Sequence, residues 1–256
     1  MTDFSSLDGR VVMVTGGAGH VGRSVVSRLL EVGAQVAVVD LEVEQMESRD
    51  RLDLPVDLGD LDEVAGLPET IVDHFGRLDV VVTAAAMVSH TAGDGAGWNV
   101  PFLSQDPALW SDALKVNLTS IFALVQAAAA PLATHGVGSV VLVSSQYGIV
   151  GPRPSLYEGT DLNNVACYAA GKAGVSQLAR WLATTMAPAV RVNSVTPGGI
   201  LRQQPEEFVR AYEELTPLGR MANEEDVVGP ILFLASDLAQ YVTGHDLVVD
   251  GGYPAW

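Results

Sequence analysis

The stretch that decides the fold is Val11-Val12-Met13-Val14-Thr15-Gly16-Gly17-Ala18-Gly19-His20-Val21-Gly22. Its first part is a short Val-rich run, which is typical of a buried parallel strand. The glycines follow at once, and residues 23–32 then show helical periodicity that stops at Gly33. A second apolar run, at residues 35–39, ends in Asp40. The order of strand, glycine-rich turn, helix, strand and acid predicts a βαβ unit.

Such a unit is suited to binding a dinucleotide. Its glycines let the backbone approach a pyrophosphate, and the helix N-terminus offers free N–H groups and the positive end of a dipole. Asp40 lies close to the spacing of about 20 residues at which a carboxylate meets the adenosine ribose hydroxyls. Because a carboxylate repels a 2′-phosphate and no Arg follows Asp40 directly, we expect NAD(H) in preference to NADP(H). The alternatives are an ordinary tight turn and an exposed carboxylate at the end of a strand.

The same alternation of strands and helices continues along the chain. We expect strands at residues 52–56, 78–82, 139–143, 190–195 and 246–249, and helices at 61–75, 106–130, 165–186 and 224–235. The sequence therefore predicts an α/β fold: a Rossmann-type, doubly wound parallel sheet of about seven strands with helices on both faces, forming a three-layer sandwich. We expect one domain over residues 1–256, with substrate loops or lids at about 87–105, 150–165 and 200–220.

Composition excludes several classes of function. The net charge of -17 argues against nucleic acid and anionic membrane surfaces as partners. The single cysteine, Cys167, allows no intramolecular disulfide and no multi-cysteine metal site, so no metal is expected. The first residues have no basic region and no long apolar core, and residues 118–133 are predicted to form a buried helix instead of a membrane span. A cytoplasmic protein is expected.

A second chemical signal lies in Ala166-Cys167-Tyr168-Ala169-Ala170-Gly171-Lys172. On a helix, the spacing of Tyr168 and Lys172 places both side chains on one face, one turn apart. A phenol ordinarily has a pKa of ~10, and a neighbouring ammonium lowers that pKa. The pair is a candidate proton-transfer device near neutral pH, although the same spacing also occurs by chance in many helices.

These motifs, in this order along the chain, resemble those of the short-chain dehydrogenase/reductase family. The resemblance covers essentially the whole chain and rests on the glycine-rich turn at 15–22 together with Asp40, Asp57, Asn117, Ser144-Ser145, Tyr168, Lys172, Pro197-Gly198-Gly199 and Asp250-Gly251-Gly252. It implies four catalytic residues. Tyr168 would be the general acid/base, Lys172 would lower the Tyr168 pKa and bind the nicotinamide ribose, and Ser145 would hold the substrate oxygen. Asn117, in the middle of its helix, would help bind a proton-relay water.

The resemblance also implies how NAD(H) is held. Asp57 and Leu58 would flank the adenine, and the backbone of residues 197–200 would contact the nicotinamide carboxamide. The full set of expected cofactor-binding residues is Gly16, Gly19, His20, Val21, Gly22, Asp40, Asp57, Leu58, Ala84, Tyr168, Lys172, Pro197, Gly198 and Ile200. Each has a simpler alternative, such as a satisfied buried amide or an ordinary turn.

A homotetramer is the assembly that the resemblance implies. The helix bearing Tyr168 and its neighbour would form one interface, and the C-terminal strand would form another. The apolar tail at 253–256 fits burial against a partner subunit, although it could also pack on its own domain.

Four departures from the family pattern bear on the substrate. His20 replaces a usual glycine, Thr83-Ala84-Ala85-Ala86 stands where polar side chains are usual, and Arg202 replaces a usual Thr. An insertion at 152–164 separates Ser145 from Tyr168 and is expected to form a wall of the pocket, or else a solvated loop. With residues 203–206 and 241–245, it looks similar to a branch linked to bacterial surface-glycan sugar synthesis.

Two cations near these segments leave two readings open. If Arg153 and Arg202 face the pocket, the substrate carries a phosphate or carboxylate. If they pair with Glu158 or Glu206, they are structural.

The first hypothesis for function is an NAD-dependent oxidoreductase that acts on a small-molecule alcohol or ketone, with a sugar derivative as one candidate substrate. The glycine pattern with His20 suggests a sugar epimerase or dehydratase with a retained cofactor, although such members usually carry a larger C-terminal substrate domain. The third alternative is a non-catalytic NAD-binding protein.

Overall fold

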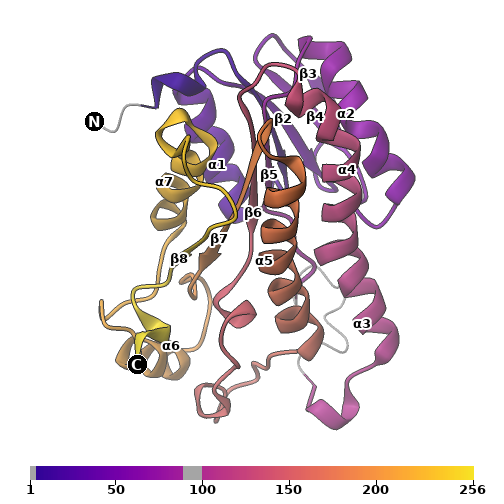
Figure 1. Ribbon diagram of the computed structural model, residues 1–256. Coiled ribbons are helices and arrows are strands. Elements are labelled where there is room, and N and C mark those ends of the chain that lie inside the picture. The colour runs from indigo at the N-terminus through magenta and orange to yellow at the C-terminus, as the bar shows by residue number, and fades with distance from the viewer. Residues whose placement is uncertain (1–3, 89–99) are drawn as a thin grey trace.

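The computed structural model describes residues 4–88 and 100–256. Within these residues the strands form one eight-stranded sheet, in the order β3-β4-β2-β1-β5-β6-β7-β8 (Figure 1). Their bounds are β1 Val11–Thr15, β2 Gln35–Asp40, β3 Met46–Glu47, β4 Arg51–Pro55, β5 Val80–Thr83, β6 Gly138–Val143, β7 Val190–Pro197 and β8 Asp246–Val249. All strand pairs are parallel except β3 with β4.

Helices cover both faces of this sheet. The helices α1 (His20–Glu31) and α7 (Glu224–Ala235) lie on one face, and α2 (Leu61–Phe75), α4 (Ser120–Ala133) and α5 (Ala166–Met186) lie on the other (Figure 1). Successive residues of β1 face opposite layers, as the two-residue period of a strand requires. Val11 and Met13 pack under α2, α4 and α5, whereas Val12 and Val14 pack under α1 and α7. The predicted three-layer α/β fold is confirmed.

Helix ends follow local sequence signals. The Asp60 carboxylate accepts the N–H groups of Asp62 and Glu63 at 3.0 and 3.2 Å and so begins α2. Gly76, with φ of 81°, ends the same helix in the left-handed region. These two signals determine where α2 begins and where it ends.

Two details differ from the prediction. A short antiparallel strand, β3, follows β2 where the alternation would place a helix. The helix expected at 106–130 is divided into α3 (Pro107–Leu114), a π-helical turn at Lys115–Thr119, and α4. A π-helical turn widens the helix locally and is frequent at functional sites.

The segment Pro107–Ala133 is apolar and long enough to span a membrane by length and composition alone, a property it shares with the core helices of soluble proteins. In the structure α4 contributes Ile121, Leu124 and Val125 to the core beneath the sheet. This agrees with the predicted buried helix.

A smaller apolar cluster lies apart from the two main layers. It joins Leu156 of the insertion, Phe208 and Tyr212 of α6 (Glu206–Glu214), Met221, and Tyr253 near the C-terminus. In Figure 1, α6 and the C-terminus lie together at the lower left. The apolar tail therefore packs partly on its own chain through Tyr253.

Candidate active site

The glycine-rich turn is shaped by close approaches that only glycine allows. Gly16 has φ of 70°, and a Cβ there would lie 2.5 Å from the backbone nitrogen of Ala85. A Cβ on Gly22 would collide with the Gly16 carbonyl oxygen. Gly19 is the N-cap of α1, so His20 and Val21 form the first turn of that helix. The N-terminus of α1 thus opens at the carboxyl end of β1, as the sequence predicts.

Asp40 is fixed beside this turn. Its Oδ2 accepts the N–H of Ala18 at 3.0 Å, and its Oδ1 accepts the N–H of Glu42 at 3.1 Å. The carboxylate therefore lies at the end of β2, next to the turn. Its contact with a ribose stays a prediction.

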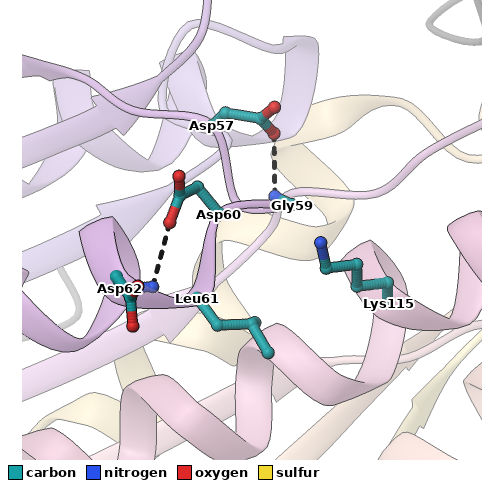
Figure 2. A pocket seen from close by; sticks show the side chains of 6 residues that line it. All are labelled: Asp57, Gly59, Asp60, Leu61, Asp62 and Lys115. Atoms are coloured by element: carbon teal, nitrogen blue, oxygen red, sulfur yellow. Dashed lines mark hydrogen bonds between the residues drawn. The ribbon is translucent and has the colours of Figure 1, made fainter.

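The residues assigned to the adenine separate in the structure. Leu58 is buried in the core, whereas Asp57 lines a pocket of about 430 Å³ with Gly59, Asp60, Leu61, Asp62 and Lys115. Figure 2 shows Lys115 extending from its helix toward the loop that carries Asp57 and Gly59. The Gly59 N–H donates to Asp57 Oδ1 at 2.7 Å and holds that loop. This pocket lies at the adenine end of the expected site and does not include Tyr168.

Two more of the residues expected to bind the cofactor lie at strand ends. The Ala84 N–H donates to the Thr15 carbonyl at 3.0 Å, which places the end of β5 against the end of β1. The Gly198 N–H donates to the Val249 carbonyl at 2.9 Å and anchors the loop after β7.

Ser145 and Tyr168 come together at the carboxyl edge of the sheet. Ser145 follows β6, Tyr168 lies in the first turn of α5, and the Ser145 hydroxyl lies near enough to the Tyr168 phenol to lower its pKa. Gly148 permits this approach, because a Cβ there would lie 2.8 Å from the Lys172 carbonyl carbon. Ser144 has a structural role: its hydroxyl donates to the Lys172 carbonyl at 2.8 Å.

Lys172 differs from the expectation. Its Nζ donates to the Val143 carbonyl at 2.8 Å and lies 5.8 Å from the centre of the Tyr168 ring. Burial lowers the pKa of Lys172 to about 8. Burial also raises the pKa of Tyr168, against the opposing effects of the Ser145 hydroxyl and the Arg202 charge. The pKa of Tyr168 is thus raised and not lowered as predicted, because burial disfavours the charged phenolate.

Asn117 lies within the π-helical turn and is fully buried. Its Oδ1 accepts the Met87 N–H at 2.6 Å, and its Nδ2 donates to the Met87 carbonyl at 3.1 Å. The amide therefore positions the chain after β5, and its role toward a water stays a prediction.

Arg202 and Arg153 have partners that the sequence did not indicate. Arg202 Nε lies 3.4 Å from Glu224 Oε1, which is also 4.0 Å from His20 Nδ1. The Arg153 guanidinium lies 5.7 Å from the centre of the Tyr253 ring. The ion pairs considered with Glu158 and Glu206 do not form. Since the Arg202 charge lowers the pKa of Tyr168, Arg202 lies near the residue expected to be the general acid/base.

The insertion contacts the segment after β5. Asn163 Nδ2 donates to the Val100 carbonyl at 2.9 Å, and the Ala166 N–H donates to Gln105 Oε1 at 3.1 Å. Residues 89–99 of the loop expected at 87–105 lie outside the described residues. These contacts join the end of the insertion and the start of α5 to the segment after β5, and a pocket wall formed by the insertion stays a prediction.

Sequence reasoning missed Gln146 and Tyr212, which meet beside Ser145. Tyr212 Oη donates to Gln146 Oε1 at 2.6 Å, and both side chains are buried. The amphipathic pattern of residues 206–214 could have indicated that Tyr212 faces inward, but not its partner.

Comparisons with known proteins show which family the chain resembles over nearly its whole length. A family model described as enoyl-(acyl carrier protein) reductase matches residues 16–254. The chain is 33% identical to a ribulose-forming D-arabinitol 2-dehydrogenase of Candida tropicalis, over 98% of this chain and 94% of that enzyme. It is 34% identical to a cis-4-hydroxycyclohexanecarboxylate dehydrogenase of Sinomonas cyclohexanicum, over 96% of this chain and 97% of that enzyme. A solved short-chain dehydrogenase from Leptospira borgpetersenii with bound NAD+ matches with a TM-score of 0.87 and 29% identity, over 99% of this chain and 96% of the other.

Proposed function

The chain belongs to the short-chain dehydrogenase/reductase family of oxidoreductases, and we propose that it is an NAD(H)-dependent dehydrogenase acting on a secondary alcohol or its ketone. The observation that carries the proposal is that Ser145 and Tyr168 lie together, with the buried Lys172 ammonium 5.8 Å from the centre of the Tyr168 ring. This group lies at the carboxyl edge of a parallel sheet, where such folds bind ligands.

The residues present fit a dinucleotide. The turn at Gly16 and Gly22 leaves no room for a Cβ, and the α1 N-terminus can receive a pyrophosphate. Asp40 favours NAD(H), because its carboxylate would accept hydrogen bonds from ribose hydroxyls and repel a 2′-phosphate. When bound, the nicotinamide supplies the acceptor or donor of the hydride.

The protein's own contribution is to position the substrate and move a proton. Ser145 would hold the substrate oxygen beside Tyr168. Because burial raises the pKa of Tyr168, its phenol keeps its proton and can donate it to a ketone oxygen. The reverse direction requires the phenolate, which the positive charge of Arg202 favours.

The substrate class is proposed from the relatives. Their names describe dehydrogenases of D-arabinitol and of cis-4-hydroxycyclohexanecarboxylate, which carry secondary alcohols. We therefore propose polyols and cyclic secondary alcohols as the first compounds to test, and the branch linked to glycan synthesis is not carried forward.

Assembly and location are proposals as well. Trp110 of α3, Phe122 of α4 and Trp181 of α5 are exposed aromatic residues on the helical face of the expected interface. They support a homotetramer, and the cytoplasmic location is proposed separately from the single cysteine, which fits a reducing compartment. Sedimentation velocity should give a tetramer, and a stable monomer would refute this assembly.

The proposal is tested by a spectrophotometric screen of polyols, sugars, cyclic alcohols and simple secondary alcohols with NAD+ and, in parallel, NADP+. The expected result is reduction of NAD+ by at least one secondary alcohol. Turnover without added NAD(H) would favour the epimerase or dehydratase alternative instead.

A further inference from the structure

We propose that Tyr212 is a positioning residue, whose hydroxyl fixes the backbone turn that receives the nicotinamide half of the cofactor. This inference rests on the proposed function, because it assigns the loop after β7 to the nicotinamide. Tyr212 comes from α6, a segment outside the family motifs on which the function rests.

The Tyr212 hydroxyl makes two short hydrogen bonds. It accepts the Gly199 N–H at 2.6 Å and donates to Gln146 Oε1 at 2.6 Å. Gln146 directly follows Ser145, and Gly199 lies in the Pro197-Gly198-Gly199 turn. A single oxygen atom therefore ties the loop carrying the serine to the turn after β7.

The other side of the Gly199 turn is held as well. The Ala222 N–H donates to the Gly199 carbonyl at 2.9 Å, and the Leu201 N–H donates to the Ala222 carbonyl at 2.8 Å. Ala222 therefore holds the Gly199 carbonyl, and Tyr212 holds the Gly199 N–H. Both hydrogen bonds together fix the orientation of the Gly199 backbone. Loss of the phenol oxygen would leave this partly buried donor without its partner.

The Tyr212 ring also packs against this turn. A Cβ on Gly199 would lie 2.9 Å from the ring carbon Cζ, and a Cβ on Gly198 would lie 3.1 Å from the hydroxyl. The two glycines thus allow α6 to close directly onto the backbone. Because the helix packs this closely, the Tyr212 hydroxyl is near enough to accept the Gly199 N–H.

The same group of phenols reaches the insertion. Tyr147 and Tyr157 share a hydrogen bond between their hydroxyls at 2.5 Å. The Tyr157 ring of the insertion lies 5.7 Å from the Phe208 ring, which stacks on Tyr212. The insertion therefore belongs to the same cluster of aromatic side chains as Tyr212.

This arrangement predicts an effect confined to one half of the cofactor. The Gly-rich turn and Asp40 hold the adenosine and pyrophosphate end and make no described contact with Tyr212. Deleting the Tyr212 hydroxyl should weaken binding of NADH but not of ADP-ribose, which lacks the nicotinamide.

Tyr253 offers a matched control. It is as buried as Tyr212, and the two rings stack with their centres 4.9 Å apart. Its hydroxyl has no hydrogen-bond partner among the described residues. Tyr253→Phe therefore removes the same atom from the same cluster without breaking a hydrogen bond.

The experiment compares the wild type, Tyr212→Phe and Tyr253→Phe. NADH binding is measured by fluorescence titration, and ADP-ribose binding is measured by calorimetry. We expect Tyr212→Phe to raise the NADH Kd by about tenfold while the ADP-ribose Kd stays within about twofold. Tyr253→Phe should change neither constant.

Three results would overturn the inference. An unchanged NADH Kd in Tyr212→Phe removes the positioning role, and equal weakening of NADH and ADP-ribose reduces Tyr212 to a general structural residue. An equal loss of NADH affinity in Tyr212→Phe and Tyr253→Phe would show that NADH binding depends on the packing of the aromatic cluster and not on the Tyr212 hydroxyl. A wild-type protein that binds no NADH would instead overturn the proposed function, and the inference with it.

Discussion

Replacing Asp40 with Asn should relax the preference for NAD+ over NADP+. Both carboxylate oxygens accept backbone N–H groups, from Ala18 at 3.0 Å and from Glu42 at 3.1 Å. The charge is therefore held at a fixed place at the end of β2. An amide keeps the shape and one acceptor oxygen but removes the charge that would oppose a 2′-phosphate.

The size of the effect follows from electrostatics. Two unit charges about 4 Å apart interact by about 4 kcal/mol at the effective dielectric near a protein surface. Asp40 is only partly buried, so screening by salt reduces this to about 2 kcal/mol. The ratio of kcat/KM for NAD+ to that for NADP+ should fall about 30-fold. The value for NAD+ itself should fall about fivefold, because a charge-assisted hydrogen bond to the ribose becomes a neutral one.

The assay is steady-state kinetics with one accepted alcohol and each cofactor in turn. Glu44→Gln is the matched control, because it removes one exposed negative charge from the same loop. The control should leave the cofactor ratio unchanged. If Asp40→Asn keeps the wild-type ratio, the carboxylate does not select the cofactor and this reasoning is wrong.

Three further outcomes are expected. Gly22→Ala should weaken NADH binding at least tenfold in a fluorescence titration, because its Cβ would collide with the glycine-rich turn. The control Gly66→Ala has no atom within 4 Å of its Cβ and should leave NADH binding intact. Equal NADH affinities of the two variants would contradict the role of the turn in cofactor binding. Lys172→Met should flatten the pH dependence of urea unfolding. With a folded pKa of about 8 against an ordinary 10.5, the unfolded wild type binds more protons between these values, so its stability rises by about 2 kcal/mol from pH ~8 to ~10; the same rise in the variant would refute this. Arg202→Gln should move the rising limb of the pH profile for alcohol oxidation to higher pH, because the Arg202 charge lowers the pKa of Tyr168; a shift to lower pH, or none, would rule out that role.

The main architecture could be predicted because the signals for strands and helices are local in the sequence. Val-rich runs, helical periodicity and the glycines after β1 each extend over a few residues, so no knowledge of tertiary contacts was needed to locate the strands and helices. The strand β3 was not predicted, because Met46 and Glu47 are both exposed and show no alternation of apolar and polar residues that would indicate a strand. Its pairing depends on β4, which lies beside it only in the folded sheet.

Contacts between distant segments could not be predicted in the same way. The π-helical turn at Asn117 accompanies hydrogen bonds to Met87, which comes from another strand end. Lys172 was expected to act on Tyr168, yet the nearest acceptor for its ammonium is the Val143 carbonyl on β6. The pairing of Arg202 with Glu224 likewise depends on how the loop after β7 meets α7. In each case the spacing along the chain carries no information about the partner.

The central claim is that Tyr168 transfers the proton in an NAD(H)-dependent reaction. The most direct test is to measure turnover and NADH binding together in Tyr168→Phe. The account predicts a loss of kcat of about 10²- to 10⁴-fold, with an NADH Kd close to that of the wild type. Turnover at the wild-type rate in this variant would contradict it.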